Sequence, residues 1–376
     1  MRPLTRREIA SAYITTLEHR EHPEVTYDQY RQRAFQRLDA FLKPKLIVYL
    51  DTKYWVWLRD PHLAGPDEVY VRQLDKMLRD GVTKGRLICP VSFPTIAELF
   101  KQHQEVRLRT ASVMDALSLG VSLKAPAEIS AIELAQLFLD LHKVADNSTY
   151  IEPVWSRAGL LFGEGVLAKA LPLAGSVLAQ KKAFTGLWTL PIREIGSFMV
   201  TGPQLPDFAS RINEERAGKP RSSYRFDQLY LAELATALDQ KREMIARSLG
   251  TCFSPSGSLP NSTGVSEEIW STFIWHTASA AIRRRGPSSL PFQRIAAALH
   301  ASIRMDDACP HKNNDLEDVM HGSSALGYCD VFLTERSLAA RILSSPVKDK
   351  AMWKCRVEHR PNAALGLLSD LIGSPN

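Results

Sequence analysis

The chain has 376 residues, of which 45% are hydrophobic and 23% are charged, so its composition is that of a globular protein and excludes a disordered one. No apolar run reaches the roughly 20 residues that a membrane helix needs, and we therefore expect no membrane partner. The net charge is +6, and the five cysteines form no CxxC pair. That cysteine pattern indicates reduced thiols and a cytoplasmic location.

The positive charge is concentrated in three short runs, at residues 219–226, 283–285 and 348–360. Runs of this kind can hold the phosphates of RNA or DNA. They can equally be a basic surface that faces solvent, and composition alone favours this second interpretation.

The first 42 residues predict two helices with a break near His22 and Pro23. The second helix has apolar residues at a spacing of three or four, which predicts one buried face. That predicted stripe consists of Tyr27, Tyr30, Ala34, Leu38 and Phe41.

A buried strand, LIVYL, follows at 46–50 and ends on Asp51. After it the pattern predicts a short helix at 54–59 and an amphipathic helix at 67–81 that Gly81 closes. A second strand is expected within 85–92, and one long helix from Pro94 to Gly120.

Residues 121–300 are rich in alanine and leucine, show helical periods and give no strong strand signal, so we expect a mostly helical insertion or second domain. A helix at 313–328, a strand at 329–334, a further helix, an edge strand within 353–359 and a last short helix follow. Outside 121–300 strands alternate with helices, which predicts an α/β fold: a parallel sheet in a three-layer α/β/α arrangement.

Acidic residues cluster around the predicted strand ends and helix starts, and ligands bind beyond the carboxyl ends of parallel strands. Carboxylates that converge there would repel each other unless a divalent cation lay between them, and such oxygen ligands suit Mg²⁺ or Mn²⁺. The candidate metal ligands are Asp51, Glu98, Asp315, Asp318, Asp330 and Glu335.

Most of these carboxylates also have a purely structural interpretation. Glu98 can close a capping box with Thr95, and Asp315 and Asp318 can favour the start of their own helix. Asp330 can be a loop residue and Glu335 a solvated helix start. Asp51 is harder to explain in this way, because Lys53 is the only basic residue that follows it closely.

Two further groups of residues, the histidines near the late helix and the aromatic residues after Asp51, also have more than one interpretation. His321 lies on the helical face of Asp318, where it can contact a phosphate or carboxylate or be a satisfied polar residue. His311 precedes the same helix. The aromatic residues after Asp51 can stack on bases or pack in the core, and for Trp55 we expect core packing.

Three stretches resemble the four motifs of PIN-domain ribonucleases, over roughly 43–110 and 305–345. "IVYLDTKYWVWL" resembles the first motif, and "VSFPTIAELFK" resembles the second, in which a helix carries a glutamate. "NNDLEDVMHGSSALGYCDVFLTERSL" resembles the third and fourth. The resemblance implies a three-layer α/β/α fold and a metal-dependent endonuclease that usually acts on RNA.

Carried over by position, the resemblance assigns metal-binding and catalytic roles to Asp51, Glu98 and Asp318, with Asp315 as a competing candidate. Thr334 matches the threonine of the fourth motif. The family commonly has an aspartate directly after it, where this chain has Glu335, so the fourth ligand stays open between Glu335, Asp330 and Asp315.

The resemblance divides the chain into N-terminal helices (1–42), a PIN-like domain in two parts (43–120 and 301–376) and the helical insertion (121–300). We expect a Mg²⁺- or Mn²⁺-dependent endoribonuclease, whose insertion recognises substrate, forms a homo-oligomer or binds a regulator. DNA stays open as a substrate. The alternative is a scaffold with little activity that binds RNA or a protein. A phosphatase of the haloacid-dehalogenase type ranks last, because its Asp-x-Asp motif would need an aspartate where Lys53 stands.

Overall fold

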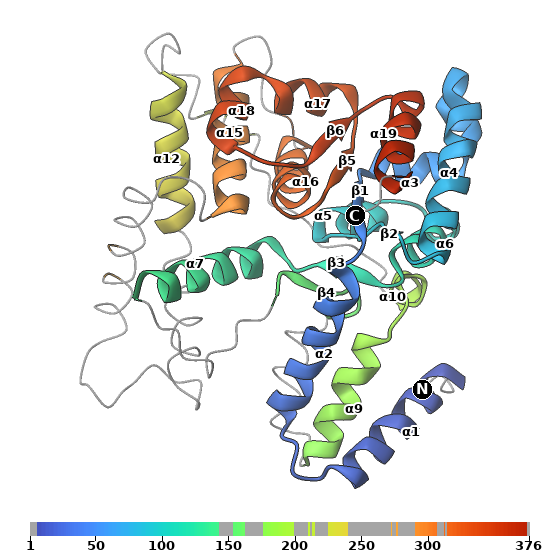
Figure 1. Ribbon diagram of the computed structural model, residues 1–376. Helices are drawn as coiled ribbons and strands as arrows, with labels where there is room; N and C mark the ends of the chain where they lie inside the picture. Colours follow the sequence, from blue (N-terminus) through green and yellow to red (C-terminus); the bar gives the residue numbers. More distant parts are fainter. Residues whose placement is uncertain are drawn as a thin grey trace. The chain divides into compact units, whose positions relative to one another are not determined.

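The computed structural model describes residues 6–142, 153–161, 176–198, 225–239, 290–306 and 314–373, and the single positions 210, 213, 214, 272, 276 and 312. By their contacts the residues form two units (Figure 1). The first unit consists of Met1–Ala125, Glu152–Pro203 and Pro361–Asn376, and the second of Pro126–Ile151 and Gln204–Arg360.

The described residues of the first unit form four strands and several helices. The strands are β1 (Leu46–Leu50), β2 (Leu87–Ile88), β3 (Val121–Leu123) and β4 (Trp155–Arg157). The helices are α1 (Arg6–Glu21), α2 (Tyr27–Leu42), α3 (Thr52–Arg59), the 3-10 helix η1 (Pro61–Asp67), α4 (Glu68–Thr83), α5 (Phe93–Phe100), α6 (Gln104–Ser118), α9 (Val177–Trp188), α10 (Ile192–Phe198) and α19 (Pro361–Gly373).

Strand β1 lies in the core of this unit. It pairs with β2 in parallel, with Leu46 opposite Leu87 and Ile47 opposite Ile88. Val48, Tyr49 and Leu50 are completely buried, which is typical of a parallel strand covered on both faces. Helix α4 packs against β2 and lies beside α19 (Figure 1). The predicted buried strand at 46–50 is confirmed.

Strands β3 and β4 lie within 121–300, the stretch in which the sequence gives no strong strand signal. They pair antiparallel, with Val121 opposite Arg157, and Val91 bridges to Ser122 on the other side. Each strand has only three residues, so neither one shows the alternation by which a strand is recognised in sequence. Their pairing depends on tertiary contacts.

The single long helix predicted over 94–120 is also wrong, because it is two helices, α5 and α6. The amides of Lys101 and Gln102 bond to carbonyls only three residues back, and His103 then takes an extended conformation with ψ 149°. Helix α4, by contrast, continues past Gly81 to Thr83. A Cβ at Gly81 would lie 2.5 Å from Leu87 Cδ2, so this glycine allows a close approach of α4 to β2.

Helices α1, α2 and α9 form a helical arm in which α9 lies between the other two (Figure 1). An aromatic cluster joins α2 to α9, because the Phe35 ring lies 5.0 Å from Trp188 and 6.4 Å from Phe184. The buried residues of α2 are Phe35, Leu38 and Leu42. The predicted apolar stripe is therefore wrong at Phe41, which is 39% exposed.

The described part of the second unit consists mainly of helices. These are α7 (Pro126–His142), α12 (Phe226–Asp239), α15 (Pro291–Met305), α16 (Asn314–Tyr328), α17 (Arg336–Leu343) and α18 (Ser345–Ala351). Strands β5 (Val331–Leu333) and β6 (Arg356–Glu358) pair in parallel, with Phe332 opposite Val357. The predicted helix at 313–328, strand at 329–334 and strand within 353–359 are confirmed.

Helix α15 organises this unit, since it contacts α7, α12, α16 and α18. Its first turn is capped by the buried Glu133, which accepts hydrogen bonds from the Phe292 amide and from the Tyr328 hydroxyl. On its other side α16 approaches closely: a Cβ at Gly322 would lie 2.6 Å from Leu299 Cδ1. These contacts hold α16, which carries several of the predicted site residues.

The protein is therefore α/β, with many helices and parallel strand pairs. Among the described residues no helix is both long and apolar enough to cross a membrane. Cys89, Cys329 and Cys355 are free and buried, and burial raises the pKa of the Cys89 thiol. Most of the predicted insertion, the basic run at 283–285, most of the run at 219–226, His311, Cys252 and Cys309 lie outside the described residues.

Gly159 and Gly186 provide a matched test of this packing. A Cβ at buried Gly159 would lie 2.1 Å from the Leu187 carbonyl oxygen, whereas one at Gly186 on α9 would meet nothing within 4 Å. We expect Gly159→Ala to lower the free energy of unfolding by roughly 1–3 kcal/mol. Gly186→Ala should raise it by about 0.5–1 kcal/mol, because alanine favours helices. Urea unfolding measures both, and equal effects would contradict the described contact.

Candidate metal centre

Asp51 lies between β1 and α3, directly after the last residue of the strand and directly before the first residue of the helix. Its backbone is extended (φ −65°, ψ 158°), and its carbonyl oxygen accepts the Tyr54 amide at 2.9 Å. Its carboxylate accepts the Thr52 amide at 2.7 Å, so the residue serves as the N-cap of α3. The side chain is only 8% exposed. A charge this deeply placed needs a compensating partner.

Glu98 brings a second carboxylate to the same place. It is half-buried on α5, and its Oε2 accepts a hydrogen bond from the Thr52 hydroxyl. A carboxylate oxygen of Asp51 and one of Glu98 lie within 4.8 Å of each other. Thr52 thus links the two acidic residues, one through its amide and the other through its hydroxyl.

Buried hydroxyl groups fix the elements that carry the two carboxylates. The Tyr49 hydroxyl on β1 lies 2.5 Å from Ser92 Oγ, which lies 3.0 Å from Thr95 Oγ1. Ser92 is the N-cap of α5, and its Oγ accepts the Thr95 amide. The end of β1 is therefore held to the start of α5.

This arrangement excludes the capping-box interpretation of Glu98. Ser92, three residues before Thr95, caps α5, so Thr95 is not the N-cap that such a box requires. Among the described residues Lys53 forms no ion pair with Asp51 or Glu98. Its ammonium group lies over the Trp57 ring, 4.3 Å from the ring centroid. Two carboxylates this close repel each other unless a proton or a cation lies between them.

In the second unit, α16 carries Asp318 and His321, three residues apart and on one helical face. Asp318 is half-buried and His321 is 1% exposed. A histidine this deeply buried is held in one orientation by its surroundings. The face therefore offers one carboxylate and one imidazole.

Asp315, the competing candidate on α16, is engaged in local structure. Its carboxylate accepts the Lys312 amide at 2.8 Å, and the Arg341 guanidinium of α17 lies 3.5 Å from it. Its contacts with the start of the helix and with the Arg341 guanidinium explain why an acidic residue stands at this position. These contacts give Asp315 a structural role at the start of α16.

Asp330 and Glu335 lie at opposite ends of β5. Asp330 is exposed at the amino end, whereas ligands of parallel strands gather at the carboxyl end. Glu335 follows buried Thr334 at the carboxyl end and accepts a hydrogen bond from the Ser337 hydroxyl. Of the two, only Glu335 occupies the end at which a ligand is expected.

The aromatic residues after Asp51 serve mainly as core. Tyr54 and Trp55 are completely buried, which confirms the packing role expected for Trp55. Trp57 is half-buried, and its ring lies 5.4 Å from that of Tyr54 in an edge-on arrangement. Stacking on bases is thereby excluded for Tyr54 and Trp55 in this conformation.

Sequence reasoning did not identify Thr52 or Tyr49 as parts of the site. The position of Thr52, directly after a strand-ending aspartate, was the one available signal for its amide contact. Its hydroxyl contact to Glu98 joins residues 46 positions apart. No local pattern reveals such a contact. The same holds for Tyr49 and Ser92.

Comparisons with known proteins identify no relative: no family model, no curated protein and no solved structure matches the chain.

The two roles of Asp51, cap and charge, can be separated by substitution. In metal-free protein we expect Asp51→Ala to lower the free energy of unfolding by about 1 kcal/mol through loss of the cap. Asp51→Asn should be at least as stable as the wild type, because asparagine caps equally well and removes the repulsion with Glu98. Thermal unfolding with a chelator present tests this, and a large destabilisation by Asp51→Asn would contradict it.

Proposed function

We propose that the protein is a Mg²⁺- or Mn²⁺-dependent endoribonuclease of PIN-like architecture, which hydrolyses RNA phosphodiester bonds. The observation that carries the proposal is the pair Asp51 and Glu98, whose carboxylate oxygens lie within 4.8 Å at the carboxyl end of a buried parallel strand. Mutual repulsion makes such a pair costly without a cation. Hard oxygen ligands of this kind suit Mg²⁺ or Mn²⁺.

The remaining ligands in this proposal come from α16. Asp318 would add a carboxylate and His321 an imidazole, which together with Asp51 and Glu98 make a mixed oxygen and nitrogen set. Mg²⁺ binds through oxygen almost exclusively, while imidazole suits transition metals. We therefore expect Mn²⁺ to bind more tightly than Mg²⁺ if His321 takes part. Glu335 is the preferred candidate for a further ligand.

The protein side chains would have distinct tasks. Asp51 holds its carboxylate in place through the Thr52 amide, and Glu98 is oriented by the Thr52 hydroxyl. Glu98 would orient the attacking water and accept its proton. A bound divalent ion would supply the charge that lowers the pKa of water and stabilises a phosphodiester in its transition state.

The proposed three-layer PIN-like architecture has partial support. Each unit contains a parallel strand pair, and Ile47–Leu50 of β1 and all of β5 are buried, as expected for strands covered by helices. The proposal requires the two units to bring their site residues to one place. The buried free thiols suit a reducing compartment, and we propose a cytoplasmic location.

The role of the predicted insertion stays open among the three that we expect from the sequence: it recognises substrate, forms a homo-oligomer or binds a regulator. The alternative function, a scaffold that binds RNA or a protein partner with little activity, is separated from the enzyme by its lack of cleavage. An assay that offers both RNA and DNA distinguishes a ribonuclease from a nuclease that acts on DNA.

The test is a cleavage assay with single-stranded RNA, structured RNA and DNA, with Mn²⁺, Mg²⁺ or a chelator. We expect RNA cleavage with either ion and none with the chelator. Asp51→Asn and Glu98→Gln should each lower the rate by about 100-fold or more, since even outer partners of metal ligands matter by 10- to 100-fold. Asp75→Asn, on α4 and paired there with Arg79, serves as the control and should leave the rate unchanged.

Calorimetry with Mn²⁺ accompanies the assay. Binding that is lost in Asp51→Asn, without cleavage of any nucleic acid, would support the scaffold instead of the enzyme. Cleavage of DNA alone would change the substrate. Absence of both binding and cleavage in the wild type would overturn the proposal.

A further inference from the structure

A pocket of about 340 Å³ lies in the first unit, lined by residues of α1, α2, β4 and α9. Its size falls at the lower end of the roughly 300–1,000 Å³ that small-molecule sites occupy. Asp51 and Glu98 are not among its lining residues. The pocket is therefore separate from the candidate metal pair.

The charge on its walls is mostly positive. Arg33, Arg37 and Arg157 line the pocket, against a single carboxylate, that of Glu18. Guanidinium groups match phosphate oxygens with paired hydrogen bonds, which makes arginine clusters suited to phosphate. The excess of arginine indicates an anionic ligand.

Two of the arginines can change or add partners at little cost. Arg33 is exposed and forms no ion pair within 4.0 Å in the part of the chain that the structure describes. Arg37 is paired with Glu18 at 3.7 Å, but its side chain is 71% exposed, and exposed pairs of this kind are weak. A phosphate could therefore compete with Glu18 for Arg37.

The pocket also has aromatic walls. Phe41 is 39% exposed, although it lies on the face of α2 where the sequence predicts core. Half-buried Trp188 contacts the rings of Phe35 and Phe184, and the Arg157 guanidinium lies 5.7 Å from its ring centroid. Rings of this kind stack on nucleobases.

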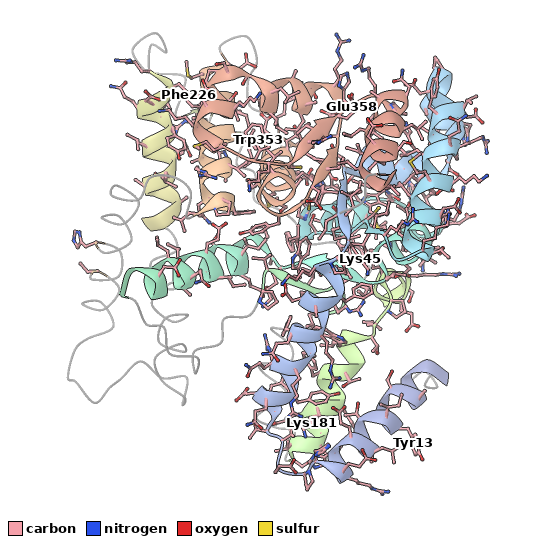
Figure 2. All side chains as sticks on the ribbon, in the orientation of Figure 1. Tyr13, Lys45, Lys181, Phe226, Trp353 and Glu358 are labelled. Carbon is pink, nitrogen blue, oxygen red and sulfur yellow. The ribbon has the colours of Figure 1, made fainter. Side chains whose placement is uncertain are left out.

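The pocket also has polar lining residues. The Tyr30 hydroxyl lies 2.8 Å from Thr185 Oγ1, and both residues line the pocket. One turn before Thr185, Lys181 is buried in the helical arm, 3.1 Å from His19 Nδ1 (Figure 2). Burial lowers the pKa of Lys181, although nearby Glu18 and Glu24 oppose this.

We propose that this pocket binds a nucleotide, with its phosphate held by Arg33 and Arg37 and its base against Phe41 and Trp188. The nucleotide is either free or one unit of a single strand, because both present the same phosphate and base. The proposal does not rest on metal-dependent cleavage, since the pocket lies on other elements and needs no divalent ion.

The test is calorimetry on the full chain in the presence of a chelator, so that no cleavage occurs. The probes are AMP, UMP, a ten-nucleotide single-stranded RNA and inorganic phosphate. We expect a nucleotide or the RNA to bind, and phosphate alone to bind at least about tenfold more weakly, because it lacks a base to stack. Binding of AMP or UMP identifies a free nucleotide as ligand, and binding of the RNA alone identifies a strand.

Substitutions that are expected to change nucleotide affinity in opposite directions distinguish a binding role of the pocket from a structural one. Arg33→Ala and Phe41→Ala should each weaken binding by about tenfold, whereas Glu18→Gln should tighten it by removing the competitor for Arg37. Arg72→Ala, an exposed arginine of α4 outside the pocket, is the control and should change nothing. No binding of any nucleotide probe, or binding that is equal in Arg33→Ala and wild type, would overturn the proposal.

Discussion

The candidate site depends on one constraint: a strand whose last three residues are completely buried is followed directly by a carboxylate. Strand β1 cannot shift without exposing apolar side chains, so Asp51 stays where the core places it, 8% exposed. The Asp51 carboxylate accepts a hydrogen bond from the amide of the next residue, Thr52, and the Thr52 hydroxyl donates a hydrogen bond to Glu98. The buried hydroxyl contact between Tyr49 and Ser92 then fixes the distance between the two elements.

The sequence was informative where structure is local. The apolar run of β1, the helix that became α16 and the strands near residues 331 and 356 all follow from periodicity and flanking residues. It failed where tertiary contacts decide: the break between α5 and α6, the three-residue strands β3 and β4, and the exposure of Phe41. The Thr52 contact to Glu98 is of the same kind, because no local signal connects residues 46 positions apart.

The helical arm shows how far chain order and spatial order differ. Helix α9 belongs to the stretch where the sequence predicts a separate insertion, yet it packs between α1 and α2 through an aromatic cluster (Figure 1). That packing covers Phe35 and leaves a pocket with three arginines beside it. The first unit therefore holds an acidic pair, suited to a cation, and a basic pocket, suited to an anion. A metal-dependent enzyme acting on a polyanion needs both kinds of surface.

The most direct test of the central claim is anomalous diffraction from crystals of the protein soaked in Mn²⁺. We predict a manganese peak in direct contact with the carboxylates of Asp51 and Glu98, and no peak there in Asp51→Asn. A wild-type structure in which Mn²⁺ is absent from this pair, with both carboxylates bonded only to Thr52, would contradict it.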